Sequence, residues 1–317
     1  MKKVANGGIP PRFLEQALPP NVRGTALWAG TGNVVCVPRT TTIMGVVKTM
    51  MEHGVRRVPV VDAGTHRLEG VMYTTHIVDF LGGGSLHNLV KNKYDGNLLA
   101  AINEDVRAIR ERGVPTSTPD IHVLDAIGQM AEKGVGGLIL LNTSNQVVGI
   151  FTERDVLKLI TEDVPPELSK LASAMDALDM VSVDDVMSRN VVCANADDTL
   201  QDGMRLMISR GFRRLPLIKD GVLIGLITSS DVIRYLGGGD VFARLVGASM
   251  GEALTVPLKS LVRQKVLTTE IKSSIKSAAL SMRVHGVGSL PVVDEGELAG
   301  IITERDIVCA IHEGVCE

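Results

Sequence analysis

Apolar residues along this chain group into one pattern that occurs four times. Each copy has a helical stretch ending in a basic residue and glycine, an apolar strand, a short polar turn and a second apolar strand. In the last three copies the second strand runs into a Thr-x-x-Asp motif at the start of another helix. A pattern that recurs in this way indicates a repeated supersecondary unit. The first strands of the four copies are residues 58–61, 138–141, 215–218 and 290–293.

The spacing of equivalent residues supports the repeat. Gly211 and Gly286 are 75 positions apart (286 − 211), and so are Asp231 and Asp306 (306 − 231), so repeats three and four align without a gap. Repeats one and two differ by one residue, which falls in the turn between their strands. Agreement of this kind is hard to obtain by chance.

The first helix of each repeat is predicted to have one apolar face. In repeat one, Ile43, Val47 and Met50 follow the spacing of an amphipathic helix. The basic residue and glycine that follow suit a cation at the negative helix end and a glycine in the left-handed conformation. Each repeat therefore reads as helix, strand, strand, helix, with an extended segment before it such as 34–36 or 191–193.

A unit of this size has too little core to fold alone, so the repeats are expected to pair. We predict an α/β (α+β) protein with two modules, 34–162 and 183–312. Gly82-Gly83-Gly84 and Gly237-Gly238-Gly239 lack the Gly-Lys-Ser/Thr of a phosphate-binding loop and are interpreted as linkers. The expected divisions are an N-terminal extension 1–33, repeat one 34–82, a linker 83–113, repeat two 114–162, an inter-module linker 163–182, repeat three 183–237, a linker 238–258, repeat four 259–312 and a tail 313–317.

Composition narrows the possible functions. The net charge of −3 and the isoelectric point near 6.2 give no overall attraction to nucleic acid. Aromatic residues make up 3% of the chain, too few for a surface that stacks single-stranded bases. No apolar run approaches the length of a membrane span, and the first residues lack the apolar core of a signal peptide, so we expect a cytoplasmic protein that does not enter a membrane.

The four cysteines are interpreted as small structural residues. They form no Cys-x-x-Cys pair, and histidines do not cluster around them at the spacing of metal ligands. No metal site is therefore predicted. The residues are Cys36, Cys193, Cys309 and Cys316.

The motifs after the second strands carry a family resemblance. Residues 149–155, 225–231 and 300–306 each read Gly, two apolar residues and Thr, with Asp three positions after the Thr. With its four-repeat layout, the chain resembles four-CBS-domain proteins such as the gamma subunit of AMP-activated protein kinase and its archaeal relatives. The resemblance implies CBS β-α-β-β-α repeats that pair into two Bateman modules and form a disc.

The same resemblance implies adenosine ligands in clefts between paired repeats, with the motif threonines on ribose or phosphate and the aspartates on ribose hydroxyls. Taken alone, Ser/Thr-x-x-Asp is also a helix capping box. Both roles can hold, because a helix N-terminus favours anions and a carboxylate can accept two hydroxyl protons. The predicted binding residues of the motifs are Thr152, Asp155, Thr228, Ser230, Asp231, Thr303 and Asp306.

Arginine pairs precede the first strand in alternate repeats, as Arg56-Arg57 and Arg213-Arg214. In the resembled family this position faces the central cleft, which implies contacts with phosphate. Arginine suits that role because its planar fork donates two parallel hydrogen bonds. A solvated surface position is the alternative for each arginine. Arg154 and Arg305, inside the motifs, either reach phosphate or lie on the exposed face of a helix.

The other repeats differ at these positions. Repeats two and four carry Gly136-Gly137 and Gly288-Ser289 in place of the arginine pairs, which we expect to leave room beside the ligand. Repeat one has Tyr73 and His76 where the others have Thr and Asp. Because imidazole lacks the paired acceptors of a carboxylate, we expect the cleft of repeat one to be empty or altered.

These features favour a sensor over an enzyme. No nucleophile elbow and no paired-histidine metal site occur, and the repeats leave no stretch long enough for a catalytic domain. We expect AMP, ADP or ATP to bind without a required metal and to regulate an unidentified protein, such as a kinase, a transporter or an enzyme. The alternatives are another adenosyl ligand, such as S-adenosylmethionine, or a scaffold with vestigial sites. A homodimer of the chain is also possible.

Overall fold

The structure is a computed structural model that describes residues 23–160, 164–238, 254–262 and 265–316. Most of the predicted linker 238–258 lies outside the described residues, including the last glycine of the second triplet. The same holds for residues 1–22 of the predicted N-terminal extension, residues 161–162 of repeat two, residue 163 of the inter-module linker, residues 263–264 of repeat four and the final residue of the tail.

Each repeat forms a three-stranded sheet that contains the two predicted apolar strands and one short strand before them. The first strand is parallel to the second, and the second is antiparallel to the third. Repeat one comprises β1 (Val37–Pro38), α2 (Ile43–His53), β2 (Arg57–Val61), β3 (Leu68–Tyr73) and α3 (Thr74–Gly82). Repeat two comprises β4 (Thr116–Ser117), α6 (Val123–Glu132), β5 (Gly137–Leu141), β6 (Val147–Thr152) and α7 (Glu153–Leu159).

The second half of the chain repeats this order. Repeat three comprises β7 (Ala194–Asn195), α10 (Leu200–Arg210), β8 (Arg214–Lys219), β9 (Val222–Thr228) and α11 (Ser229–Gly237). Repeat four comprises β10 (Thr269–Glu270), α14 (Ile275–His285), β11 (Ser289–Asp294), β12 (Glu297–Thr303) and α15 (Glu304–Cys316). The connecting helices are α1 (Ala26–Ala29), η2 (Ser85–His87), α4 (Asn88–Tyr94), α5 (Leu98–Ala101), η3 (Val106–Ala108), η4 (Pro166–Leu168), α8 (Ser169–Ala177), α9 (Val183–Val186) and η5 (Leu258–Leu261).

Local sequence signals explain where the helices begin and end. Helix α2 begins after Thr42, whose Oγ1 accepts a hydrogen bond from the Gly45 N–H at 3.0 Å. It ends at Gly54, which has a φ of 63° and therefore takes the predicted left-handed conformation. The short strands β1 and β7 do not coincide with the predicted extended segments. They begin directly after residues 34–36 and 191–193 and are two residues long.

Two large hydrophobic cores each join a repeat of one module to a repeat of the other. Helices α2 and α3 of repeat one pack against α10 and α11 of repeat three. Helices α6 and α7 of repeat two pack in the same way against α14 and α15 of repeat four. A smaller core joins the strands of repeats one and two, and its buried members are Val61, Val71, Val114, Ile139 and Val147.

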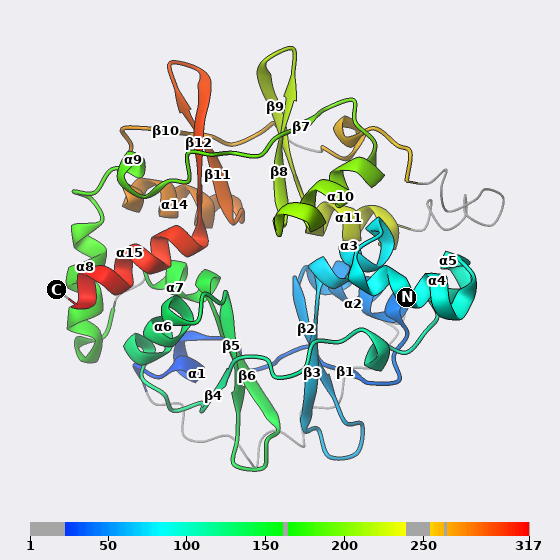
Figure 1. The fold of residues 1–317 in the computed structure, drawn as a ribbon. Helices are drawn as coiled ribbons and strands as arrows, with labels where there is room; N and C mark the ends of the chain where they lie inside the picture. Colours follow the sequence, from blue (N-terminus) through cyan, green and yellow to red (C-terminus); the bar gives the residue numbers. More distant parts are fainter. Residues whose placement is uncertain (1–22, 161–163, 239–253, 263–264, 317) are drawn as a thin grey trace, which may run out of the picture.

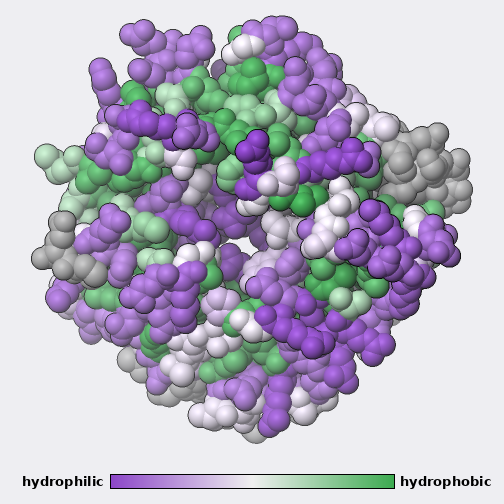
Figure 2. Space-filling model, viewed as in Figure 1, coloured by the Kyte–Doolittle hydropathy of each residue, from purple (hydrophilic) through white to green (hydrophobic). Residues whose placement is uncertain are grey.

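The four repeats are arranged around a centre and form the predicted disc (Figure 1). The hairpins β2–β3, β5–β6, β8–β9 and β11–β12 point their turns outward, toward the rim. Their inner ends, where each motif begins, therefore lie toward the centre. Hydrophilic residues surround the opening at the centre of the face shown in Figure 2. The fold thus gathers all four motif segments in one polar region.

Candidate functional site

The Thr-x-x-Asp motifs cap the helices that follow the third strands. Asp155 Oδ2 accepts hydrogen bonds from the backbone N–H of Thr152 at 2.9 Å and from its hydroxyl at 2.7 Å. Asp231 Oδ2 accepts the same two bonds from Thr228 at 2.8 and 2.6 Å. The capping interpretation is therefore confirmed for both motifs.

The other carboxylate oxygens differ in their surroundings. Asp155 Oδ1 pairs with Lys158 Nζ at 2.5 Å, and this side chain is 4% exposed. Asp231 Oδ1 pairs with Arg234 Nη1 at 2.6 Å, but its side chain is 21% exposed. Burial raises the pKa of Asp306 above its ordinary value, although hydrogen bonds from Thr303 act in the opposite direction. The three aspartates are therefore not equivalent, and Asp231 is the more open of the first two.

A cavity of about 510 Å³ opens beside the motif of repeat three. Three predicted polar residues line it, Thr228, Ser230 and Asp231, and residues 285–289 of repeat four form part of another wall. Apolar side chains, Leu226 among them, complete the surface. Four of the predicted arginines also line this cavity, and they come from three repeats: Arg56, Arg154, Arg213 and Arg214.

The remaining predicted residues lie elsewhere. Thr152, Asp155, Thr303 and Asp306 do not line this cavity, and neither do Arg57 and Arg305. Arg57 Nη2 donates to the carbonyl oxygen of Gly136 at 2.9 Å, and Arg214 Nη1 donates to that of Gly288 at 2.6 Å. These two contacts are equivalent, because each joins the second arginine of a pair to the glycine of the neighbouring repeat.

The glycines opposite the arginine pairs make room for protein side chains, and Gly288 and Ser289 also line the cavity. A Cβ added at Gly137 would lie 2.5 Å from Arg57 Nη1. A Cβ added at Gly288 would lie 2.8 Å from Glu304 Oε2 and 3.0 Å from Arg56 Nη1. Any larger residue at these two positions would therefore displace an arginine or a glutamate.

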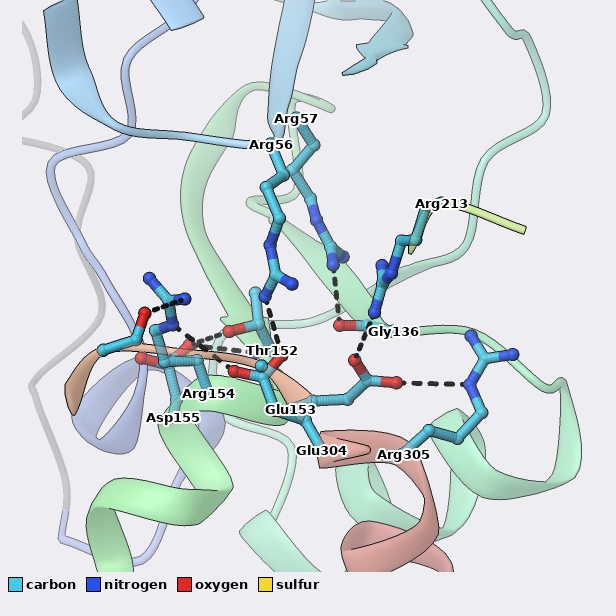
Figure 3. A network of polar contacts seen from close by, with 12 residues as sticks. Arg56, Arg57, Gly136, Thr152, Glu153, Arg154, Asp155, Arg213, Glu304 and Arg305 are labelled. Atoms are coloured by element: carbon cyan, nitrogen blue, oxygen red, sulfur yellow. Dashed lines mark hydrogen bonds and ion pairs between the residues drawn. The ribbon is translucent and has the colours of Figure 1, made fainter. Parts of the chain in front are cut away.

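Two buried glutamates at the centre of the disc were missed by the sequence analysis. Glu153 and Glu304 follow the motif threonines of repeats two and four (Figure 3), and each is 1% exposed. Glu304 pairs with Arg56 at 2.7 Å and with Arg154 at 3.5 Å. The signal that could have identified them is an acid at one motif position in two repeats, where the other two repeats have a hydroxyl residue.

Glu153 has the corresponding partners on the opposite side. It pairs with Arg213 at 3.4 Å and with Arg305 at 3.2 Å. At the same motif position in repeats one and three, the hydroxyls of Thr74 and Ser229 share a buried hydrogen bond of 2.8 Å. The centre therefore has an approximate twofold relation that exchanges repeat one with three and repeat two with four.

The pKa values of this cluster reflect its burial and its charges. Burial would raise the pKa of Glu304, but Arg56, Arg154 and Arg214 hold it below its ordinary value. Burial, together with the nearby Arg213 and Arg56, lowers the pKa of Arg214 to about 9. At neutral pH the Glu304 carboxylate is therefore ionised and the Arg214 guanidinium is protonated.

Repeat one differs from the other repeats in the contacts of its motif residues. His76 Nδ1 accepts a hydrogen bond from the backbone N–H of Tyr73 at 3.4 Å, in place of the capping carboxylate. Its Nε2 lies 3.3 Å from Glu111 Oε2, and the Tyr73 ring meets the imidazole edge-on. Burial lowers the pKa of His76, whereas Glu111 acts to raise it. The motif residues Tyr73 and His76 of repeat one therefore contact each other, and His76 also contacts Glu111.

The described residues contain no group of three or more His, Cys, Asp and Glu side chains placed to hold a metal ion. Within the same residues no helix is both long and apolar enough to cross a bilayer. Burial raises the pKa of Cys36 to about 12, which keeps its thiol protonated and of low reactivity.

Comparison with known proteins agrees with this architecture. The CBS domain family matches residues 30–83, 106–162, 183–238 and 258–313, which together make up most of the chain. The chain belongs to the CBS-domain family. As a four-CBS-domain protein, it is similar to MJ1225 of Methanocaldococcus jannaschii, with 38% identity over 277 residues, covering 87% of this chain and 94% of that protein.

Two solved structures are similar to this four-CBS-domain protein over most of its length. The crystal structure of MJ1225, described as a suggested archaeal homologue of g-AMPK, matches with a TM-score of 0.79 and 36% identity, covering 90% of this chain and 98% of that chain. A conserved protein from Pyrococcus horikoshii shares the fold, with a TM-score of 0.55 and 16% identity, covering 90% of this chain and 99% of that chain. A 33.4 kDa protein from Thermofilum pendens is 31% identical over 272 residues, covering 86% of each chain.

Proposed function

We propose that this protein is a non-catalytic sensor that binds AMP, ADP or ATP in the cavity beside the repeat-three motif and regulates a partner protein. The observation that carries the proposal is the combination, in one cavity of about 510 Å³, of Asp231 with four arginines. The carboxylate suits a ribose diol and the guanidiniums suit phosphate. The volume lies within the range of roughly 300–1,000 Å³ that is usual for small-molecule sites.

Membership of the CBS family supports a regulatory role that depends on a ligand. The regulated protein is unidentified, and a kinase, a transporter or another enzyme would each fit. We place the protein in the cytoplasm, bound neither to nucleic acid nor to a membrane. Ligand binding would require no metal, because the arginines themselves supply positive charge. A homodimer of discs is compatible with this function and is not required by it.

The two alternative functions predict different roles for the arginines of the cavity. S-adenosylmethionine carries a sulfonium cation and no phosphate, so the positive charge of Arg56, Arg213 and Arg214 would repel it. A scaffold with vestigial sites would need no cationic cavity at all. The position of four arginines in the same cavity as Asp231 favours a phosphorylated ligand over both alternatives.

The test is a calorimetric titration of the intact chain with ATP, ADP, AMP, adenosine and S-adenosylmethionine. We expect the three nucleotides to bind at least tenfold more tightly than adenosine, because only they engage the arginines, and we expect S-adenosylmethionine not to compete. Preferred binding of S-adenosylmethionine would favour the first alternative. An absence of binding by every ligand in the panel would favour a scaffold.

A further inference from the structure

The two central glutamates hold the same arginines that line the cavity. Arg56 and Arg154 face the cavity and both pair with Glu304. Arg213 also faces the cavity and pairs with Glu153. Neither carboxylate lines this cavity, and both point toward the guanidiniums with which they pair (Figure 3). A phosphate that entered would therefore meet arginines that already have an anionic partner.

The cluster keeps an excess of positive charge in spite of these pairs. The arginines that contact the two glutamates or the facing glycines outnumber these glutamates by four (6 − 2), and they are Arg56, Arg57, Arg154, Arg213, Arg214 and Arg305. The arginines remain partly open, since the side chains of Arg56 and Arg154 are 22% and 47% exposed. Two buried anions thus lower, but do not cancel, the attraction of the centre for a further anion.

The partners of each glutamate come from other repeats. Arg154 of α7 pairs with Glu304 of α15, and Arg305 of α15 pairs with Glu153 of α7. An arginine in the first turn of each helix therefore pairs with the glutamate in the first turn of the other. Buried ion pairs contribute little net stability, because desolvation offsets much of the attraction. A role in stability alone therefore gives weak reason for two such acids beside a cationic cavity.

We propose that Glu153 and Glu304 are internal anions that compete with ligand phosphate for the arginines of the cavity, and thereby set how much negative charge a ligand must carry to bind. The proposal rests on the proposed function, because it concerns the same cavity. It makes these two glutamates specificity-determining residues that need not touch the ligand. A ligand with more phosphate charge overcomes the competition more readily, and a neutral nucleoside is not affected by it.

The test measures how affinity depends on ligand charge in Glu304→Gln. Removing this carboxylate while keeping the side-chain shape is expected to tighten ATP binding on the order of tenfold and AMP binding roughly threefold, with adenosine unchanged. The matched control is Glu69→Gln. Glu69 also pairs with two arginines, Arg39 at 2.8 Å and Arg110 at 3.2 Å, but it does not line the cavity. We expect no change in any affinity for that variant.

Glu153→Gln provides a second test if Glu304→Gln does not fold, as judged by circular dichroism and thermal melting. It frees Arg213 in place of Arg56 and is expected to act in the same direction. Equal or weaker ATP binding in the folded variants, with wild-type binding intact, would overturn the role of the glutamates and leave the proposed function standing.

Inorganic pyrophosphate separates the two proposals if the wild type binds no adenine nucleotide. That result would reject the proposed function. The competition by the glutamates would still predict pyrophosphate binding that is roughly tenfold tighter in Glu304→Gln than in the wild type or Glu69→Gln. Pyrophosphate affinity that is the same in all three proteins would reject the competition as well.

Discussion

At the scale of single residues, Asp231 has two roles that can be separated. It caps α11 and it lines the cavity. Asp231→Ala is expected to weaken nucleotide binding by about 2–4 kcal/mol, because two charge-assisted bonds to ribose are lost. The free energy of unfolding should fall by only about 1 kcal/mol, which is typical for a lost cap. Titration calorimetry and urea unfolding measure the two effects.

Asp202→Ala is the matched control for that variant. Asp202 forms the same kind of capping box with Thr199 at the start of α10, but it does not line the cavity. We expect a similar loss of stability and full nucleotide affinity. If both variants retained wild-type affinity, Asp231 would be a helix cap and nothing more.

The residues of the site were predictable only in part. The motif threonines and aspartates recur at one position of a repeat, so the pattern indicated Thr228 and Asp231, which line the cavity, without a structure. The partners of Glu304 could not be found in this way, because Arg56 and Arg154 lie 248 and 150 positions away in the chain. Which acid meets which arginine depends on how four similar repeats are arranged in space, and a local pattern does not contain that information.

At the scale of elements, the contact between helices of different modules depends on a small residue. A Cβ added at Gly82 of α3 would lie 2.9 Å from Met204 Cβ and 2.8 Å from Ile208 Cδ1 of α10. Gly82→Ala is therefore expected to lower the free energy of unfolding by about 1–2 kcal/mol, because the helices must separate slightly. Urea unfolding of the intact chain measures this change.

Gly64→Ala is the control for that substitution. Gly64 is exposed in the turn between β2 and β3, and its added Cβ would meet only Asp62 Oδ1, at 3.6 Å. The expected change is within about 0.5 kcal/mol. An unchanged free energy of unfolding for Gly82→Ala would mean that α3 and α10 do not pack as closely as the structure places them.

The periodicity of the sequence predicted the helices and strands more completely than it predicted how they pack together. The first helix of repeat one and the strands of all four repeats were predicted from apolar spacing and from glycines such as Gly54. The short strands β1 and β7 were placed a few residues early, since two-residue strands have no periodicity of their own. Pairing of α3 with α10 could not be predicted, because the helices of every repeat present a similar apolar face.

At the scale of the whole molecule, the cores tie the two modules together. Each large core contains buried residues from both modules, so either half of the chain alone would expose an extensive apolar surface. The cavity also depends on both modules, because Arg56 and Arg154 come from the first and Asp231 from the second. We therefore expect binding of the proposed ligand to require the intact disc, and it is measured on the full chain.

The most direct test of the central claim is a crystal structure of the intact chain grown with ATP. We expect the nucleotide in the cavity between repeats three and four, with its ribose hydroxyls on Asp231 and its phosphates within hydrogen-bonding distance of Arg56, Arg154 or Arg213. A structure in which this cavity is empty while ATP occupies another site, or in which the ribose faces away from Asp231, would contradict the account.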